Sequence, residues 1–447
     1  SSTSVETYET LALSAARHVF DDAERRQAVV GCDPSPACSR AFLARVGRLA
    51  FRRALSDEEL ERYGTLADTL GHDPEDPSQG LMYALSGLLQ SPHFLYRVEL
   101  GVPDPSRPGR LSYSGHEMAT RLAFLIWNQG PDDALIAEAE AGRLQSEEDI
   151  RAQVTSMLAD DRARVGLREF LADLLDASAI ATLEKDLLVF PAFDEALAEA
   201  MHAQFLRTAE SAVEHGYGHL FTTRVTYINA LLAPFYGVDD AAFGESLEEL
   251  EMSDESPRAG ILTTPGYLAL HAYLGKTSPA QRGLFVRRRL LCRDIPPPPA
   301  DVDTTLPEPP GGELVTTREL VSIHLESDSC ASCHRLMDPI GLGLEEFDAI
   351  GAYRETENEI DIDPSGELEG VPFNDAAELG EVVANHPDLL PCLMANLYAY
   401  GAANTIATNN AALRPLLDRM DGDDVRSAIL SLAMSEHFRY AFPRESP

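Results

Sequence analysis

The chain has 447 residues, and its apolar fraction of 44% and aromatic fraction of 7% are those of an ordinary folded protein. Acidic residues outnumber basic ones by 73 to 36, so the formal net charge is −37, a surface that repels nucleic acid and anionic lipid. No apolar run approaches the ~18 residues of a membrane span, so none is expected.

The first part of the chain, residues 1–105, is expected to be a helical unit. It begins with SSTSVETYET, which has no charged-then-apolar leader and is typical of a mature or trimmed start. Apolar residues then follow helical spacing at 5–28, 38–54 and 78–99. Cys32 and Cys38 close a short loop containing two prolines, where a disulfide is expected.

A Pro- and Gly-rich segment at 101–110 separates this unit from a central helical domain, expected over 106–255. The spacing that favours a helix-starting capping box occurs at Ser56–Glu59, Ser114–Glu117 and Thr316–Glu319. Strand patterns are few and short, as at 226–232. We therefore predict a mainly α, multi-helical fold with a few short β-hairpins.

The third part, 256–355, contains a helix, a stiff proline-rich strap at 295–312 and the motif Cys330-Ala-Ser-Cys333-His334. The two-residue gap between the cysteines matches the separation of the two haem vinyl groups. The histidine that follows lies under the iron as its proximal ligand. The motif predicts one covalent haem c per chain.

Three other uses of this motif remain open. A structural zinc site needs four ligands, and Cys330, Cys333 and His334 supply three. A thioredoxin-like redox pair needs an α/β unit, which a mainly helical chain lacks. The third alternative is a structural disulfide between Cys330 and Cys333.

Residues after the motif are expected to shape the haem environment. Met337, on the same side of the iron as His334, would pack against the haem edge. Asp338 directly before Pro339 predicts that the haem helix ends there. Glycines that would let the backbone approach a flat cofactor follow at Gly341, Gly343 and Gly351.

The sixth ligand of the iron decides between electron transfer, if it is His or Met, and peroxide or oxygen chemistry, if the position is open. The distal candidates are His93, His271 and Met394, with His116 and His324 as further ones. Each could instead be an ordinary core or helix-end residue. Arg282 and the run Arg287–Arg289 could pair with haem propionates or form an ion-paired helix face.

The last part, 356–447, is expected to hold a hairpin around Pro364–Gly366, followed by helices. Residues 361–369 place oxygen side chains at calcium-loop positions, but Pro372 stands where the bidentate Glu belongs, so a hairpin turn is expected. Once the motif cysteines are assigned to haem, Cys292 and Cys392 pair by elimination. An even cysteine count of this kind suits a periplasmic or extracellular location.

Several stretches together resemble a known group of sequences. They are SPHFLYRVELG (91–101), RLAFLIWNQGPDDALI (121–136), TSPAQRGLFVRRRLLCRDIPPPPADVD (277–303), CASCHRLMDPIGLGLEEFDAIGAYR (330–354) and CLMANLYAYG (392–401). In order and spacing they are similar to the secreted planctomycete- and myxobacterium-type multi-domain proteins of unknown function. That resemblance implies export and a cytochrome-c-like segment, and it implies no substrate.

A simple c-type electron carrier needs about one hundred residues, far fewer than this chain has. The leading prediction is therefore an exported haem-dependent oxidoreductase of peroxidase or oxygenase character. It would act on a small-molecule oxidant or substrate, or with a redox partner protein. The alternatives are a non-catalytic, six-coordinate electron carrier and a non-haem binding or scaffold protein with a Cys330–Cys333 disulfide.

Overall fold

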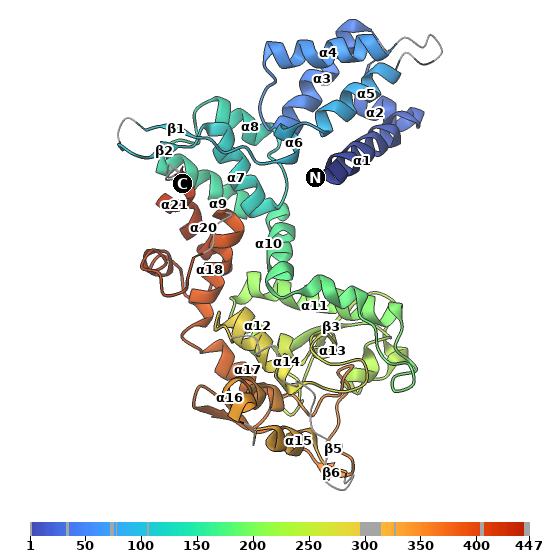
Figure 1. The fold of residues 1–447 in the computed structure, drawn as a ribbon, viewed down its shortest axis with the longest axis vertical. Coiled ribbons are helices and arrows are strands. Elements are labelled where there is room, and N and C mark those ends of the chain that lie inside the picture. Colours follow the sequence, from blue (N-terminus) through green and yellow to red (C-terminus); the bar gives the residue numbers. More distant parts are fainter. Residues whose placement is uncertain are drawn as a thin grey trace. The chain divides into compact units, whose positions relative to one another are not determined.

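The computed structural model describes residues 2–32, 35–71, 76, 78–104, 107–295, 314–325, 328–402 and 406–441. Helices make up 58% of it and strands 6%, which confirms the mainly α fold (Figure 1). Residue contacts divide the chain into two compact units: unit 1 is 1–159 with 433–447, and unit 2 is 160–432. None of the described helices is long and apolar enough to cross a membrane.

Unit 1 consists of short helices and one small sheet. Its helices are α1 (Ser2–Phe20), α2 (Ala23–Val30), α3 (Pro36–Phe51), α4 (Asp57–Leu70), α5 (Gln79–Leu89), α6 (Pro92–Leu95), α7 (Gly115–Trp127), α8 (Asp133–Glu140), α9 (Glu147–Leu158) and α21 (Glu436–Arg439). Its strands are β1 (Val102–Pro103), β2 (Leu111–Ser112) and β9 (Tyr440–Ala441), which form an antiparallel sheet with β2 in the middle.

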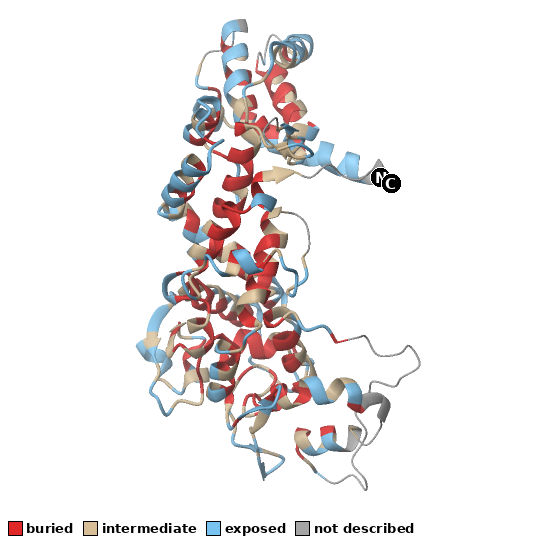
Figure 2. Cartoon of the chain, turned by 90° about the vertical axis from the view of Figure 1, so that its left-hand side faces the viewer, coloured by how far each residue is buried: buried red, intermediate tan, exposed pale blue. Residues whose placement is uncertain are grey.

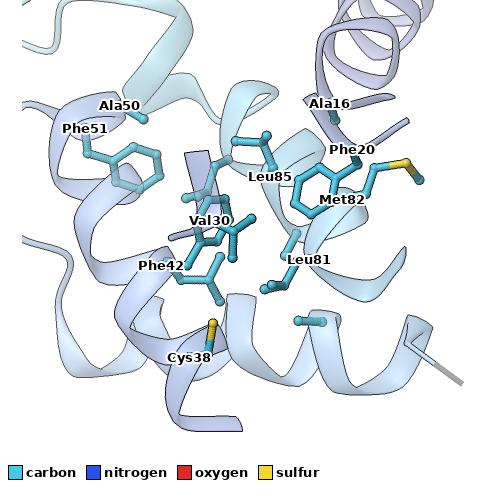
Figure 3. Close-up of a cluster of buried hydrophobic side chains, with 14 residues drawn as sticks. Ala16, Phe20, Val30, Cys38, Phe42, Ala50, Phe51, Leu81, Met82 and Leu85 are labelled. Atoms are coloured by element: carbon cyan, nitrogen blue, oxygen red, sulfur yellow. The ribbon is translucent and has the colours of Figure 1, made fainter. Parts of the chain in front are cut away.

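A compact apolar core joins α1, α3 and α5 in unit 1 (Figure 3). Phe20 and Phe42 meet edge to face with ring centroids 6.2 Å apart. Leu81 and Leu85 of α5 belong to the same cluster. Cys38 also belongs to it, and its disulfide to Cys32 is formed as expected.

The predicted capping boxes are confirmed. In α4 and α7, the Ser side chain accepts from the N–H of the Glu three residues on, and that Glu accepts from the N–H of the Ser. Thr316 and Glu319 make the same reciprocal bonds, at 2.7 and 3.3 Å. Each box provides partners for backbone N–H groups that a helix start leaves unpaired.

Among the described residues, unit 2 contains the longest helix and three antiparallel strand pairs. Its α-helices are α10 (Asp161–Leu174), α11 (Glu195–His215), α12 (His219–Thr222), α13 (Pro265–Leu270), α14 (Pro279–Phe285), α15 (Thr317–His324), α16 (Asp328–Leu342), α17 (Ala376–Ala384), α18 (Leu389–Ala402), α19 (Arg414–Leu417) and α20 (Val425–Ala433). A π-helix at Val286–Leu290 continues α14, and 3₁₀ helices occur at Ala177–Thr182, Ala233–Tyr236, Asp240–Ala242 and Ile261–Thr263.

The paired strands of unit 2 are β3 (Val225–Ile228) with β4 (Glu248–Glu251), β5 (Thr356–Glu357) with β6 (Ile360–Asp361), and β7 (Gly366–Leu368) with β8 (Val371–Phe373). The strand predicted at 226–232 is present in its first half. Most helices of both units have buried residues on one side and exposed residues on the other (Figure 2).

The hairpin predicted around Pro364–Gly366 is wrong. Two separate hairpins form instead, and each reverses through two residues with positive φ: Asn358 and Glu359 in the first, Glu369 and Gly370 in the second. Two consecutive left-handed residues match the twist of the flanking strands, so they determine where the chain folds back.

The second predicted disulfide, Cys292–Cys392, is also formed. Cys292 lies two residues after the π-helix ends at Leu290, and Cys392 lies in α18. The bond closes a loop with a sequence separation of 100 residues, within which the motif Cys330-Ala-Ser-Cys333-His334 lies. It therefore restricts the unfolded chain around the motif.

Replacing Phe42 by Ala should lower the free energy of unfolding of unit 1 by about 3–5 kcal/mol, because its ring is 1% exposed in the core of Figure 3. Trp127, the single tryptophan, lies in unit 1, so its fluorescence in a denaturant titration reports that unfolding. Leu49→Ala in the same helix is the control, since Leu49 is 42% exposed. Equal effects of the two changes would contradict the assigned core.

Candidate functional site

The cysteine–histidine motif lies on one continuous helix, α16. Cys330 and Cys333 are three residues apart, so their positions are neighbours on its surface, and His334 is adjacent. Cys333 is a half-buried free thiol. The Cys330 side chain lies outside the described residues. A free thiol at Cys333 argues against the disulfide alternative.

His334 is held by a carboxylate one turn further along the helix. Its Nδ1 lies 2.8 Å from Oδ2 of Asp338, whose side chain is 1% exposed. The other carboxylate oxygen, Oδ1, is buried and has no hydrogen-bond partner among the described atoms. Because this bond uses Nδ1, Nε2 is the ring nitrogen that would have to bind a metal. A carboxylate behind a ligating histidine fixes the ring and increases its basicity.

The predicted helix end at Asp338 is wrong, because α16 runs through Pro339 to Leu342. Proline removes one backbone N–H and normally breaks or kinks a helix interior. Here the turn after Pro339 is held by tight packing against α14. Asp338 therefore stays in the helix, which is what places its carboxylate four residues after His334.

Two glycines allow α14 and α16 to pack backbone against backbone. A Cβ at Gly283 would lie 1.9 Å from the carbonyl oxygen of Met337, and a Cβ at Gly341 would lie 1.9 Å from that of Pro279. Real Cβ atoms never approach that closely, so any side chain at either position would separate the helices. The atoms closest to Gly341 therefore belong to the protein backbone. Met337 itself is half-buried.

The other two glycines expected to approach a cofactor also face protein. A Cβ at Gly343 would lie 2.5 Å from the ring of Phe373, and one at Gly351 would lie 2.6 Å from Cα of Pro265. Gly351 also has φ +87°, a conformation that side chains rarely adopt. These glycines therefore serve the packing around α16.

Arg282 of α14 is completely buried. Its Nη1 donates to the carbonyl oxygens of Leu344 and Phe347 at 2.6 and 3.0 Å, and its Nη2 donates to that of Asp348 at 2.8 Å. Glu345 lies 3.2 Å away as its charge partner. The guanidinium thus binds the segment after α16, and this geometry favours the ion-paired structural role over a contact with a haem propionate.

Glu345 connects Arg282 to a larger buried network. Its carboxylate accepts from the Thr277 hydroxyl at 2.6 Å and pairs with Arg354 at 3.2 Å. Burial raises the pKa of Glu345, and the two arginines oppose that effect. Buried charges are tolerated only when they are paired and hydrogen-bonded in this way.

His271, a distal-ligand candidate, lies on the far side of α14 from α16. Gly283 faces α16, whereas Phe285, on another face of α14, contacts the His271 ring with centroids 4.5 Å apart. The ring also packs on Tyr267, at 4.8 Å. Burial, followed by the charges of Arg282 and Arg289, lowers the pKa of His271 to about 3. The structure therefore does not bring this histidine to His334.

The remaining distal candidates have structural surroundings of their own. Met394 is fully buried in α18. His93 and His116 belong to unit 1, whereas the motif belongs to unit 2. There, Nε2 of His93 lies 3.9 Å from Glu59, and that of His116 lies 3.8 Å from Glu140. The His324 side chain lies outside the described residues.

One cluster with metal-binding residue types escaped sequence reasoning. Glu369, His386 and Asp388 bring potential ligand atoms within 4.8 Å of one another. However, Arg287 and Arg293 pair with the two carboxylates, and Nδ1 of His386 accepts the Asp388 N–H at 3.2 Å. The cluster is therefore an ion-paired network. No local pattern predicts it, because Glu369 is distant from the other two in sequence.

Three segments of the chain match family models, each described as a protein of unknown function. PSD5 (DUF1595) matches residues 38–99, PSD4 (DUF1592) matches 113–238, and PSCyt3 (DUF1588) matches 258–357. Over these three segments the chain is similar to families of unknown function, which agrees with the multi-domain, unknown-function part of the resemblance noted from its motifs. The PSCyt3 segment includes α14, Arg282 and the whole of α16. Comparisons with curated proteins and with solved structures find no match.

Lowering the pH should destabilise the protein through His271. Burial lowers its pKa from an ordinary value of about 6.5 to about 3 in the folded protein, so below pH 6.5 the unfolded chain takes up a proton that the folded chain excludes. This linkage costs about 2 kcal/mol of unfolding free energy between pH 7 and pH 5. His271→Gln should remove this contribution to the pH dependence of the unfolding free energy. That free energy is measured by denaturant titrations followed by circular dichroism. Parallel slopes in the two proteins would contradict the buried neutral imidazole.

Proposed function

We propose that the chain is an exported c-type haem protein that acts as an oxidoreductase of peroxidase or oxygenase character. The haem would be attached through Cys330 and Cys333 and bound at iron by His334. The observation that carries this proposal is the bond between Nδ1 of His334 and the buried Asp338. With the proton on Nδ1, this bond would orient the histidine of the Cys-x-x-Cys-His helix so that Nε2 could bind a metal.

The donor set around α16 fits a haem iron. Because Oδ1 of Asp338 has no hydrogen-bond partner, burying this carboxylate beside a neutral imidazole alone costs free energy. An imidazole whose Nε2 binds a cation becomes a stronger N–H donor, and it would compensate that buried charge. Cys333 is a free thiol, as thioether formation requires.

The remaining cysteines support the same assignment. The two disulfides use the other four cysteines of the chain. Disulfides form and persist in oxidising compartments, which is compatible with a periplasmic or extracellular location. The abbreviation PSCyt in the matching family model also suggests a cytochrome-like segment.

Each residue would have a defined task. His334 would bind the haem iron through Nε2, and Asp338 would hold its Nδ1–H and increase electron donation from the ring. A bound haem supplies one-electron and oxygen or peroxide chemistry. Strong donation from the proximal side favours reduction of a bound oxidant. His271, in a ring cluster, and Met394, in the core, are held by packing within the protein, which supports an oxidoreductase over the non-catalytic electron carrier.

Replacing both motif cysteines by Ala should abolish covalent haem attachment, because no thioether can then form. The protein is produced with a c-type maturation system, and the haem that stays with the chain after acid–acetone extraction is measured by absorbance. The control, Cys32→Ala with Cys38→Ala, should retain the full amount. Wild-type protein that is colourless, or that loses its haem on extraction, would contradict the proposal.

Asp338→Asn should leave haem attachment intact and raise the midpoint reduction potential. The neutral amide still accepts the Nδ1–H bond but no longer stabilises the ferric state by its charge. Asp418→Asn, which removes an equal charge on the exposed surface of α19, is the control for the loss of net charge. Equal potentials for the two variants in a redox titration would show that Asp338 does not act on the iron.

A further inference from the structure

The small sheet that β3 and β4 form in unit 2 ends in an open edge. Strand β4 pairs with β3 on one side, and no other strand among the described residues pairs with it. The free edge of a sheet carries unpaired N–H and C=O groups, to which another extended chain can add as a further strand. Strand β4 lies at the surface, with Leu250 half-buried and its other three residues exposed.

The register of the sheet identifies which backbone groups face the open edge. The Met252 N–H donates to the Arg224 carbonyl oxygen at 2.8 Å, directly beyond the last pair of the register. Backbone groups that face the partner strand alternate along an antiparallel strand. Leu250 therefore bonds to β3, whereas the N–H and C=O groups of Glu249 and Glu251 point away from it. Outside the β3–β4 ladder, neither glutamate has a backbone hydrogen-bond partner in the described part of the chain.

A cavity of about 690 Å³ borders this edge. Leu250 and Met252, whose side chains share one face of β4, line it together with Phe235 and Tyr236 from the connection between the two strands. Tyr353 from the segment after α16 lines it as well. All five side chains are partly accessible, and Tyr353 is 41% exposed. The cavity can therefore receive apolar side chains of a strand that is added beside β4.

The charges around the edge decide which strand fits it. Residues 248–255 (EELEMSDE) contain five acidic residues and no basic one. None of these five carboxylates forms an ion pair with another residue in the described ranges. Repulsion therefore disfavours the same edge of a second copy, which carries the same carboxylates and a net charge of −37. A strand with basic side chains is complementary to the edge.

We propose that β4 binds an extended basic segment of another protein by antiparallel strand addition. Strands β3 and β4 already pair in this way, and antiparallel pairing is slightly more stable per residue than parallel pairing. Basic side chains opposite Glu249 and Glu251 would share their face and pair with the two carboxylates. The alternate residues of the segment would be apolar and face the cavity. The site does not involve the haem motif, so this proposal stands or fails separately from the proposed oxidoreductase activity.

Calorimetric titration of the full chain with an acetylated and amidated hexapeptide of alternating arginine and leucine tests this proposal. The control peptide has the same composition, but all its leucines precede all its arginines. Saturable binding of the alternating peptide is expected, about fivefold or more tighter than binding of the block peptide. The reason is that only the alternating peptide presents its two residue types on opposite faces of a strand.

Backbone methylation of the alternating peptide tests the mode of binding without any change to the protein. In antiparallel addition, the peptide residues opposite Glu249 and Glu251 direct their N–H groups toward β4, and these residues are the arginines. N-methylation of the arginines should therefore abolish binding. N-methylation of the leucines, whose N–H groups point away from β4, should change the affinity less than about twofold. Equal effects of the two modifications, or a loss confined to leucine methylation, would overturn the proposal.

Glu249→Gln with Glu251→Gln should weaken binding of the alternating peptide about fivefold, because two exposed cross-strand ion pairs are lost. The control, Glu195→Gln with Glu199→Gln, removes the same charge from the exposed side of α11, outside the cavity lining, and should have little effect. Absence of saturable binding, equal affinity for the block peptide, or equal effects of the two double variants would contradict the proposal. Sedimentation of the protein alone as a dimer that the peptide dissociates would also contradict it, because the edge would then bind a second copy.

Discussion

The buried guanidinium of Arg282 is the interaction on which the surroundings of the candidate site depend. It donates to three carbonyl groups in the segment after α16 and pairs with Glu345, so α14 and that segment are joined by charge-assisted bonds in the protein interior. A buried arginine is costly unless its charge is paired and hydrogen-bonded. The segment therefore lies close to α14 in space. Helix α16 packs against the same helix at Gly283 and Gly341.

This constraint leads directly to the geometry at His334. Because the close contact between α14 and α16 holds the helix through Pro339, Asp338 stays helical and one turn from the histidine. The same close packing buries Asp338, which strengthens its interaction with the imidazole. The Cys292–Cys392 disulfide anchors the other end of the α14 region to α18. The proposed haem ligand is therefore positioned by a scaffold of helices rather than by a flexible loop.

Sequence reasoning predicted features that depend on local chemistry, and it missed those set by distant contacts. Helix starts such as Ser114–Glu117, the disulfide loops and the mainly α class follow from spacing and composition alone. The continuation through Pro339 depends on α14, which is remote in the sequence. The sequence places Asp338 four residues after His334, which is the spacing of a contact along one helix face. The Asp-Pro turn signal indicated instead that the helix ends at Asp338. Strand β4 was not predicted either, because its run of acidic residues lacks the alternation of a half-buried strand.

The central claim is that iron porphyrin is bonded through sulfur to α16. Cleavage at arginine releases the peptide between Arg318 and Arg335, which contains Cys330, Cys333 and His334. Mass spectrometry of that peptide, from protein matured with haem available and denatured in acid, tests the claim most directly. The account predicts a peptide heavier by one haem. A peptide of unmodified mass, or one lighter by the two hydrogens lost in a disulfide, would contradict it.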